Sequence, residues 1–182
     1  MIRHSTDNHS KLNADASILA GGRSQRMGRN KAWLPLGNES AIARIVRILS
    51  GAFDSVRIIT NDTREFESLE VPVEIDMRPD SGPLGGIHTA LSTTKHQATF
   101  VLGCVYPFIN AHFIRGLAGL FPNHDALVPR QDRVPVPVCA FYSRRCLPVV
   151  ERALDRRILE ARMFLSQVDV RWVEGQELKE LD

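Results

Sequence analysis

The sequence has 182 residues, which is enough for one globular domain that buries a core without disulfides or metals. Its composition is 43% hydrophobic and 24% charged, so neither a disordered chain nor a membrane span is expected. The formal net charge is only +2, no basic cluster is present, and the three cysteines show no Cys-x-x-Cys spacing. We therefore expect a cytoplasmic protein without a nucleic-acid partner, a membrane partner, a zinc site or a disulfide framework.

The N-terminal residues 1–15 are polar and lack periodicity, so we expect a flexible tail followed by a single domain over residues 16–182. Order begins with an apolar run, Ala16–Ala20, that ends in Gly21 and Gly22. This pattern is typical of a buried strand that leads into a tight loop.

The next helix is marked by a cap and by the spacing of its apolar residues. Ser40 is a candidate N-cap, and apolar residues recur at three- and four-residue intervals from Ile42 to Phe53. Strands and helices alternate from there on. The expected strands are residues 56–60, 71–75, 98–104, 126–128 and 168–173, and the expected helices are residues 85–94, 112–120, 145–154 and 158–166.

The segment Val134–Tyr142 looks extended but contains Pro135 and Pro137, so we expect an edge strand or a crossing segment there. The alternation of strands and helices predicts an α/β fold with a mostly parallel sheet and helices on both faces. Sheets of this kind bind ligands beyond the carboxyl ends of their strands, often in the first strand-to-helix loop.

That first loop runs from Leu19 to Lys31 and combines two adjacent glycines with basic side chains. The glycines let the backbone turn sharply against a ligand, and Arg26 and Lys31 can place positive charge on phosphate oxygens. The loop has neither the Gly-Lys-Ser/Thr of a Walker A loop nor the Gly-x-Gly-x-x-Gly of dinucleotide-binding folds. Its composition predicts a nucleoside triphosphate site, with an ordinary surface loop as the alternative.

The full string of the loop is more specific than its composition. Residues 19–32, Leu-Ala-Gly-Gly-x-Ser-x-Arg-Met-Gly-x-Asn-Lys-Ala, resemble the signature loop of the molybdenum cofactor guanylyltransferases. Two later segments, Asp76–Ile87 and Pro137–Ser143, resemble the same family in the same order. The resemblance extends over about residues 17–173 and implies a three-layer, Rossmann-like nucleotidyltransferase domain.

The resemblance implies transfer of GMP from GTP to the phosphate of molybdopterin or Mo-molybdopterin, with release of pyrophosphate. A phosphate nucleophile is already ionised at neutral pH, so the protein mainly has to align the substrates and offset charge at the α-phosphate. Arg26 and Lys31 would be the catalytic residues, and molybdoenzyme maturation proteins are candidate partners. The residues that the resemblance places on the nucleotide are Leu19, Ala20, Gly21, Gly22, Lys31, Asn61, Asp76, Gly82, Pro83 and Leu84. For Asn61 and Asp76, which follow strands, an ordinary turn residue is the alternative.

The sequence departs from the family pattern at the Mg²⁺ site. Family members place an Asp ligand for Mg²⁺ directly after the central strand, and Val105 occupies that position here. Valine offers no oxygen, whereas Mg²⁺ prefers oxygen ligands. The Asn-x-Asn-Thr-Pro segment that relatives carry near the metal is also absent from the sequence.

Three hypotheses remain at this point. The main one is a working guanylyltransferase that uses Mg²⁺ through other ligands. The second is a GTP-binding pseudoenzyme of the same family, and the third is a cytidylyltransferase or sugar-phosphate nucleotidyltransferase. The Gly21-Gly22 pair favours GTP, because relatives that use CTP usually carry a second Ala in this loop.

Overall fold

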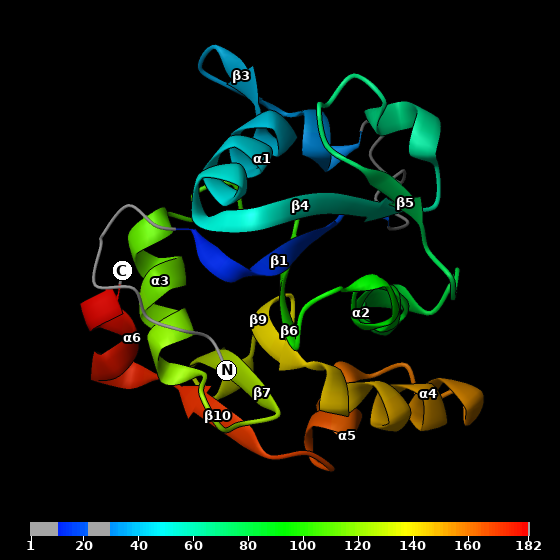
Figure 1. Ribbon diagram of the computed structural model, residues 1–182, viewed down its shortest axis with the longest axis vertical. Coiled ribbons are helices and arrows are strands. Elements are labelled where there is room, and N and C mark those ends of the chain that lie inside the picture. The colour runs from blue at the N-terminus through cyan, green and yellow to red at the C-terminus, as the bar shows by residue number, and fades with distance from the viewer. Residues whose placement is uncertain (1–10, 22–29, 182) are drawn as a thin grey trace.

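The computed structural model describes residues 11–21 and 30–181, which form an eight-stranded sheet with helices packed on it (Figure 1). The strands of this sheet are β1 (Leu12–Leu19), β4 (Phe53–Thr60), β5 (Val73–Ile75), β6 (Ala98–Gly103), β7 (Ala126–Gln131), β8 (Val134–Pro135), β9 (Cys139–Ser143) and β10 (Val170–Val173). The helices are α1 (Ala41–Ala52), α2 (Gly82–Thr93), α3 (Ala111–Leu120), α4 (Leu147–Asp155), α5 (Ala161–Leu165) and α6 (Gly175–Leu181). Strands β2 (Pro35–Leu36) and β3 (Glu39–Ser40) pair separately.

The strand order is β10-β7-β9-β6-β1-β4-β5, with β8 paired to β7. Strand β1 is parallel to both β4 and β6, β5 is parallel to β4, and β10 is parallel to β7. Strand β9 runs antiparallel between β6 and β7. The expected mostly parallel α/β sheet is confirmed. Because β1, β4 and β6 are parallel neighbours, the loops that follow them meet at one end of the sheet.

The helices cover both faces of the sheet, so the expected three layers are confirmed (Figure 1). Helices α1 and α3 pack on one face, and α2, α4 and α5 pack on the other. Side chains of β6 therefore point alternately to the two faces. Phe100 and Leu102 pack in the core beneath α1 and α3, and Val101 packs in the core beneath α2, α4 and α5. Within the described part of the chain, no helix is long and apolar enough to cross a membrane.

The expectation of an edge or crossing segment at residues 134–142 is wrong for its second half. Strand β9 lies inside the sheet, with β6 on one side and β7 on the other. The bounds of β9 make this possible, because both prolines precede Cys139, where β9 begins. Pro135 lies in β8, which pairs only with β7 among the described residues, so neither proline interrupts an interior ladder.

The expectation that residues 1–15 form a tail is wrong for residues 12–15, because β1 begins at Leu12. The polar sequence hides this strand, since Asp15 is completely buried. Its carboxylate pairs with the buried guanidinium of Arg57 in β4 and accepts a hydrogen bond of 2.8 Å from Thr94 Oγ1. A buried charge is tolerated when it is paired in this way.

Helix α2 begins at Gly82, three residues before the expected start at Gly85, so residues 82–84 also belong to the helix. Pro83 suits this position, because a proline in the first turn loses no helical hydrogen bond. His88 lies further along the same helix. Its side chain is buried between α2 and α4, 3.7 Å from Glu151, and burial lowers the pKa of its imidazole.

Candidate functional site

A cavity of about 390 Å³ opens where β1, β4 and β6 end. Its wall combines the backbone after β1, the start of α2 and the residues after β6. The lining residues are Leu19, Ala20, Gly21, Asn30, Ile59, Asp76, Gly82, Pro83, Gly86, Gly103, Cys104, Val105 and Val138. The structure thus brings the segment 19–21 together with Asp76, Gly82, Pro83 and Val105, as the order of the sequence motifs suggests.

The chain leaving β1 runs tightly between its two neighbouring strands. The Ala20 N–H donates to the Ile59 carbonyl at 2.9 Å, and the Leu19 carbonyl accepts from the Cys104 N–H at 3.1 Å. A Cβ added at Gly21 would lie 3.3 Å from the backbone nitrogen of Asn61, which is closer than ordinary packing. Because glycine has no Cβ, the chain at Gly21 can lie close to the end of β4. Asn61 lies behind Gly21 and is not part of the cavity wall.

The carboxylate of Asp76 is held in place from one side only. Its Oδ1 accepts hydrogen bonds from the Arg78 N–H at 2.9 Å and the Thr89 hydroxyl at 3.0 Å. The Asp76 N–H donates to the Thr60 carbonyl at 2.8 Å, which fixes the turn at the end of β4. Oδ2 makes no hydrogen bond to the described residues, and Asp76 lines the cavity.

The turn that carries Asp76 closes on Gly85 of α2. A Cβ at Gly85 would lie 2.5 Å from the Arg78 carbonyl oxygen and 3.1 Å from Asp76 Oδ2. We expect Gly85→Ala to displace this turn, to cost about 1–3 kcal/mol of stability and to weaken nucleotide binding. Chemical denaturation and nucleotide titration measure the two effects.

Gly51 gives the matched control for this substitution. It lies in helix α1, and a Cβ there would meet nothing within 4 Å. We expect Gly51→Ala to leave nucleotide affinity unchanged and to stabilise the protein by up to about 1 kcal/mol. Equal effects of the two substitutions would show that the space around Gly85 does not matter.

The basic part of the loop is described only at its end. Lys31 is exposed at the start of a 3₁₀ turn, Lys31–Trp33, and is not among the residues lining the cavity. Asn30 caps this turn by accepting from the Ala32 N–H at 3.0 Å and lines the cavity. The expected roles of Gly22 and Arg26 concern residues outside the described ranges. Leu84, which was also expected at the nucleotide, is instead buried in the core beneath α2.

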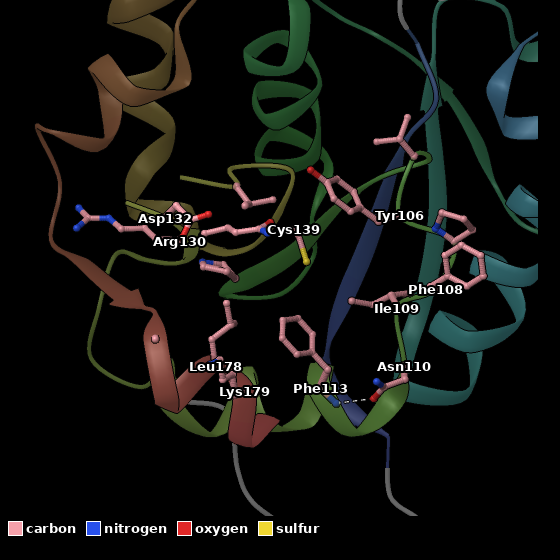
Figure 2. A pocket seen from close by; sticks show the side chains of 16 residues that line it. Tyr106, Phe108, Ile109, Asn110, Phe113, Arg130, Asp132, Cys139, Leu178 and Lys179 are labelled. Atoms are coloured by element: carbon pink, nitrogen blue, oxygen red, sulfur yellow. Dashed lines mark hydrogen bonds between the residues drawn. The ribbon is translucent and has the colours of Figure 1, made fainter. Parts of the chain in front are cut away.

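A second, larger cavity of about 610 Å³ lies on the other side of Val105, which lines both cavities. Its wall includes aromatic and aliphatic side chains from the loop after β6, from α3 and from α6 (Figure 2). Its charged residues are Arg130, Asp132 and Lys179. The Arg130 guanidinium lies 3.4 Å from the ring centroid of Trp172, so a cation–π interaction with this ring holds the Arg130 side chain.

Sequence patterns did not reveal this second cavity, because its wall comes from segments that are far apart in the chain. One local signal could have indicated it. The sequence Val-Tyr-Pro-Phe follows the most apolar strand, and Val105 and Phe108 are 53% and 76% exposed. Large apolar side chains exposed beside a cavity are typical of a binding surface.

The residues at these cavities do not form a protein-held Mg²⁺ site. No group of three or more His, Cys, Asp or Glu residues within residues 11–21 and 30–181 could hold a metal ion. Val105 presents only methyl groups, and Asp76 is the one carboxylate lining the smaller cavity in the described part of the chain. The thiol of Cys104 is half-buried, and burial raises its pKa, which disfavours the thiolate that binds metals.

The site thus has a glycine-containing turn at the carboxyl end of β1 and a carboxylate, Asp76, directly after the parallel strand β5. Ligand-binding loops at the carboxyl ends of parallel strands are typical of nucleotide-binding α/β domains. Residues 16–171 match the model of the MobA-like NTP transferase domain, and the chain belongs to this family of nucleotidyltransferases. The family resemblance seen in the sequence is confirmed.

A curated relative agrees with this assignment, and two solved structures share the fold. The chain is 34% identical to a probable molybdenum cofactor guanylyltransferase from Carboxydothermus hydrogenoformans, over 92% of this chain and 85% of the relative. Its fold is similar to molybdopterin-guanine dinucleotide biosynthesis protein A from Archaeoglobus fulgidus, with a TM-score of 0.78, 24% identity, and coverage of 92% and 87% of the two chains. It is also similar in fold to a Mycobacterium tuberculosis protein solved in complex with manganese, with a TM-score of 0.63, 14% identity, and coverage of 92% and 96%.

Proposed function

We propose that this chain is a molybdenum cofactor guanylyltransferase, which transfers GMP from GTP to Mo-molybdopterin and releases pyrophosphate. The observation that carries the proposal is the smaller cavity, where the backbone at 19–21 faces Asp76 and the start of α2 in a chain of this family. Such a reaction belongs to cofactor biosynthesis, and we infer a cytoplasmic protein with molybdoenzyme maturation proteins as candidate partners.

The chemistry requires alignment more than proton transfer. An oxygen of the molybdopterin phosphate, already ionised, forms a bond to the α-phosphorus of GTP as the bond to the pyrophosphate oxygen breaks. The protein has to hold the two phosphates in line and to offset their charge. We assign Lys31 and Arg26 to the triphosphate, and the carboxylate of Asp76 to donors on the guanosine. The backbone at Leu19, Ala20 and Gly21 would contact the nucleotide, with Gly22 beside it.

The second cavity supplies a place for the acceptor. Val105 separates the two cavities, so a ligand in the larger one can bring a phosphate to the α-phosphate of a nucleotide in the smaller one. Tyr106, Phe108 and Phe113 suit the flat ring system of a pterin (Figure 2). Arg130 and Lys179 outnumber the one carboxylate in its wall, Asp132, and this excess of positive charge suits an anionic ligand.

Mg²⁺ belongs to the proposal only as an ion that arrives with GTP, because the described side chains do not build a site for it. This departure keeps the pseudoenzyme as a second candidate, and Val105 is the observation that favours it. A GTP-binding protein without transfer activity would bind the nucleotide but form no dinucleotide product.

Lys31→Ala tests the assignment of the loop. Loss of a charged hydrogen bond to a phosphate is expected to weaken GTP binding about 10- to 100-fold, as measured by calorimetric titration. Lys95→Ala is the matched control, since Lys95 is an exposed lysine before β6, at the opposite end of that strand from the cavity. Equal GTP affinities of the two variants would show that Lys31 does not bind the nucleotide.

Competition between nucleotides tests the substrate. We expect GTP to displace a fluorescent guanine nucleotide at lower concentration than CTP does. Preference for CTP would instead favour a cytidylyltransferase, and no displacement by either nucleotide would contradict the nucleotide site itself.

A further inference from the structure

The loop between β6 and α3, residues 104–110, is the wall that the two cavities share. Val105 lines both cavities, and the segment 106–110 lines the larger one. Within the loop, the Tyr106 N–H donates to the Gly103 carbonyl at 3.2 Å and the Ile109 N–H to the Tyr106 carbonyl at 3.4 Å. The first distance is at the upper end of the usual range for a hydrogen bond and the second lies beyond it, so contacts from outside the loop can contribute to its position.

Arg44 provides such a contact from helix α1. Its Nε donates to the Pro107 carbonyl at 2.9 Å, across 63 residues of sequence. The other end of the guanidinium is held by β3, since Arg44 Nη1 lies 3.6 Å from Glu39 Oε1. Arg44 lines neither cavity, so any effect it has on a ligand must pass through the loop.

The neighbouring Arg47 shows what is particular to Arg44. It lies on the same helix and binds the same carboxylate, with Nη2 2.7 Å and Nε 3.2 Å from the two oxygens of Glu39. Its hydrogen bonds to the described residues go to Glu39 alone. The two arginines therefore share one partner, and Arg44 alone of the pair bonds to the loop.

We propose that Arg44 is a positioning residue that fixes the loop 104–110 and, through it, the second substrate relative to the nucleotide. The proposal rests on the proposed function, because it concerns how an acceptor in the larger cavity meets GTP in the smaller one. In-line transfer is sensitive to such placement, since a shift of about 1 Å can cost about a hundredfold in rate.

Arg44→Met and Arg47→Met form a matched pair, since each removes one guanidinium from Glu39. Hydrogen exchange of the Tyr106 and Ile109 amides measures the loop directly. We expect about tenfold faster exchange in Arg44→Met, the effect of losing one charge-assisted hydrogen bond, and less than a twofold change in Arg47→Met. Equal exchange in the two variants would overturn the proposal.

Transfer kinetics separate positioning from general stability. In Arg44→Met we expect kcat/KM for molybdopterin to fall at least about tenfold while the GTP affinity stays within twofold, and in Arg47→Met we expect neither to change. Faster exchange without a change in kcat/KM for molybdopterin would overturn the role toward the acceptor. If the unaltered protein transferred no GMP, the proposed function would fail. In that case, the hydrogen-exchange comparison would still decide whether Arg44 fixes the loop. Titration of molybdopterin onto both variants would decide whether the loop positions the acceptor.

Discussion

Val105→Asp is expected to raise the rate of GMP transfer in the presence of Mg²⁺ at least about tenfold. The reason is the position of Val105, on the wall between the two cavities, with its side chain 53% exposed. A carboxylate there adds an oxygen ligand where the described residues offer little beyond Asp76, and a metal ion offsets the charge of the transferred phosphate. Steady-state kinetics of the variant and the unaltered protein measure the effect.

Val134→Asp is the control for this result. Val134 is 60% exposed in β8 and lines neither cavity, so a new carboxylate there should leave the rate unchanged. Titration with Mn²⁺ in the presence of GTP gives a second measure, and we expect tighter binding only for Val105→Asp. Equal rates and equal Mn²⁺ binding in all three proteins would show that residue 105 is not at the metal position.

Arg57→Met is expected to lower the free energy of unfolding by about 3–5 kcal/mol, the largest stability effect that the structure predicts. The substitution leaves the carboxylate of Asp15 completely buried without its counter-ion. It also removes the hydrogen bond of 2.7 Å from Arg57 to Thr93 at the end of α2. Urea denaturation followed by circular dichroism measures the loss.

An exposed ion pair gives the comparison. Arg145 lies 2.7 Å from Asp125, with its side chain 64% exposed, and we expect Arg145→Met to cost less than about 1 kcal/mol. Replacing both members of the buried pair, as in Asp15→Leu/Arg57→Met, should recover part of the loss because no unpaired charge remains. If Arg57→Met were no more costly than Arg145→Met, Asp15 would not depend on Arg57.

Local sequence patterns predicted the parts of the fold that local chemistry determines. The hydroxyl of Ser40 caps α1 by accepting from the Ala43 N–H at 3.3 Å, as expected. The apolar run at residues 98–104 forms β6, which is buried along its whole length. In both cases the neighbouring residues in the sequence carry enough information to define the element.

The errors arose where distant residues decide the outcome. The start of β1 was missed because Asp15 looks like a tail residue until Arg57 and Thr94, 42 and 79 positions away, surround it. The interior place of β9 was missed because its prolines lie before the strand, which the composition of the segment does not show. Such features depend on tertiary contacts and have no local signature.

The candidate site divides in the same way. Gly21 could be predicted because glycines after a buried strand indicate a ligand-binding turn, whereas Asp76 was expected only from the family resemblance. The structure places both residues at one cavity. Arg44 could not be predicted, since an arginine on the polar side of a helix is ordinary until its contact with Pro107 is seen. The second cavity likewise requires the fold that brings α3, β7 and α6 together.

Transfer of labelled GMP from GTP to molybdopterin tests the central claim most directly. The reaction should be run with Mg²⁺ on the unaltered protein, with Val105→Asp beside it and with labelled CTP as the competing donor. We predict a labelled guanine dinucleotide and one pyrophosphate per transfer from the unaltered protein, with a higher rate for the variant. Absence of product from both proteins, or transfer of CMP in preference to GMP, would contradict the assignment as a molybdenum cofactor guanylyltransferase.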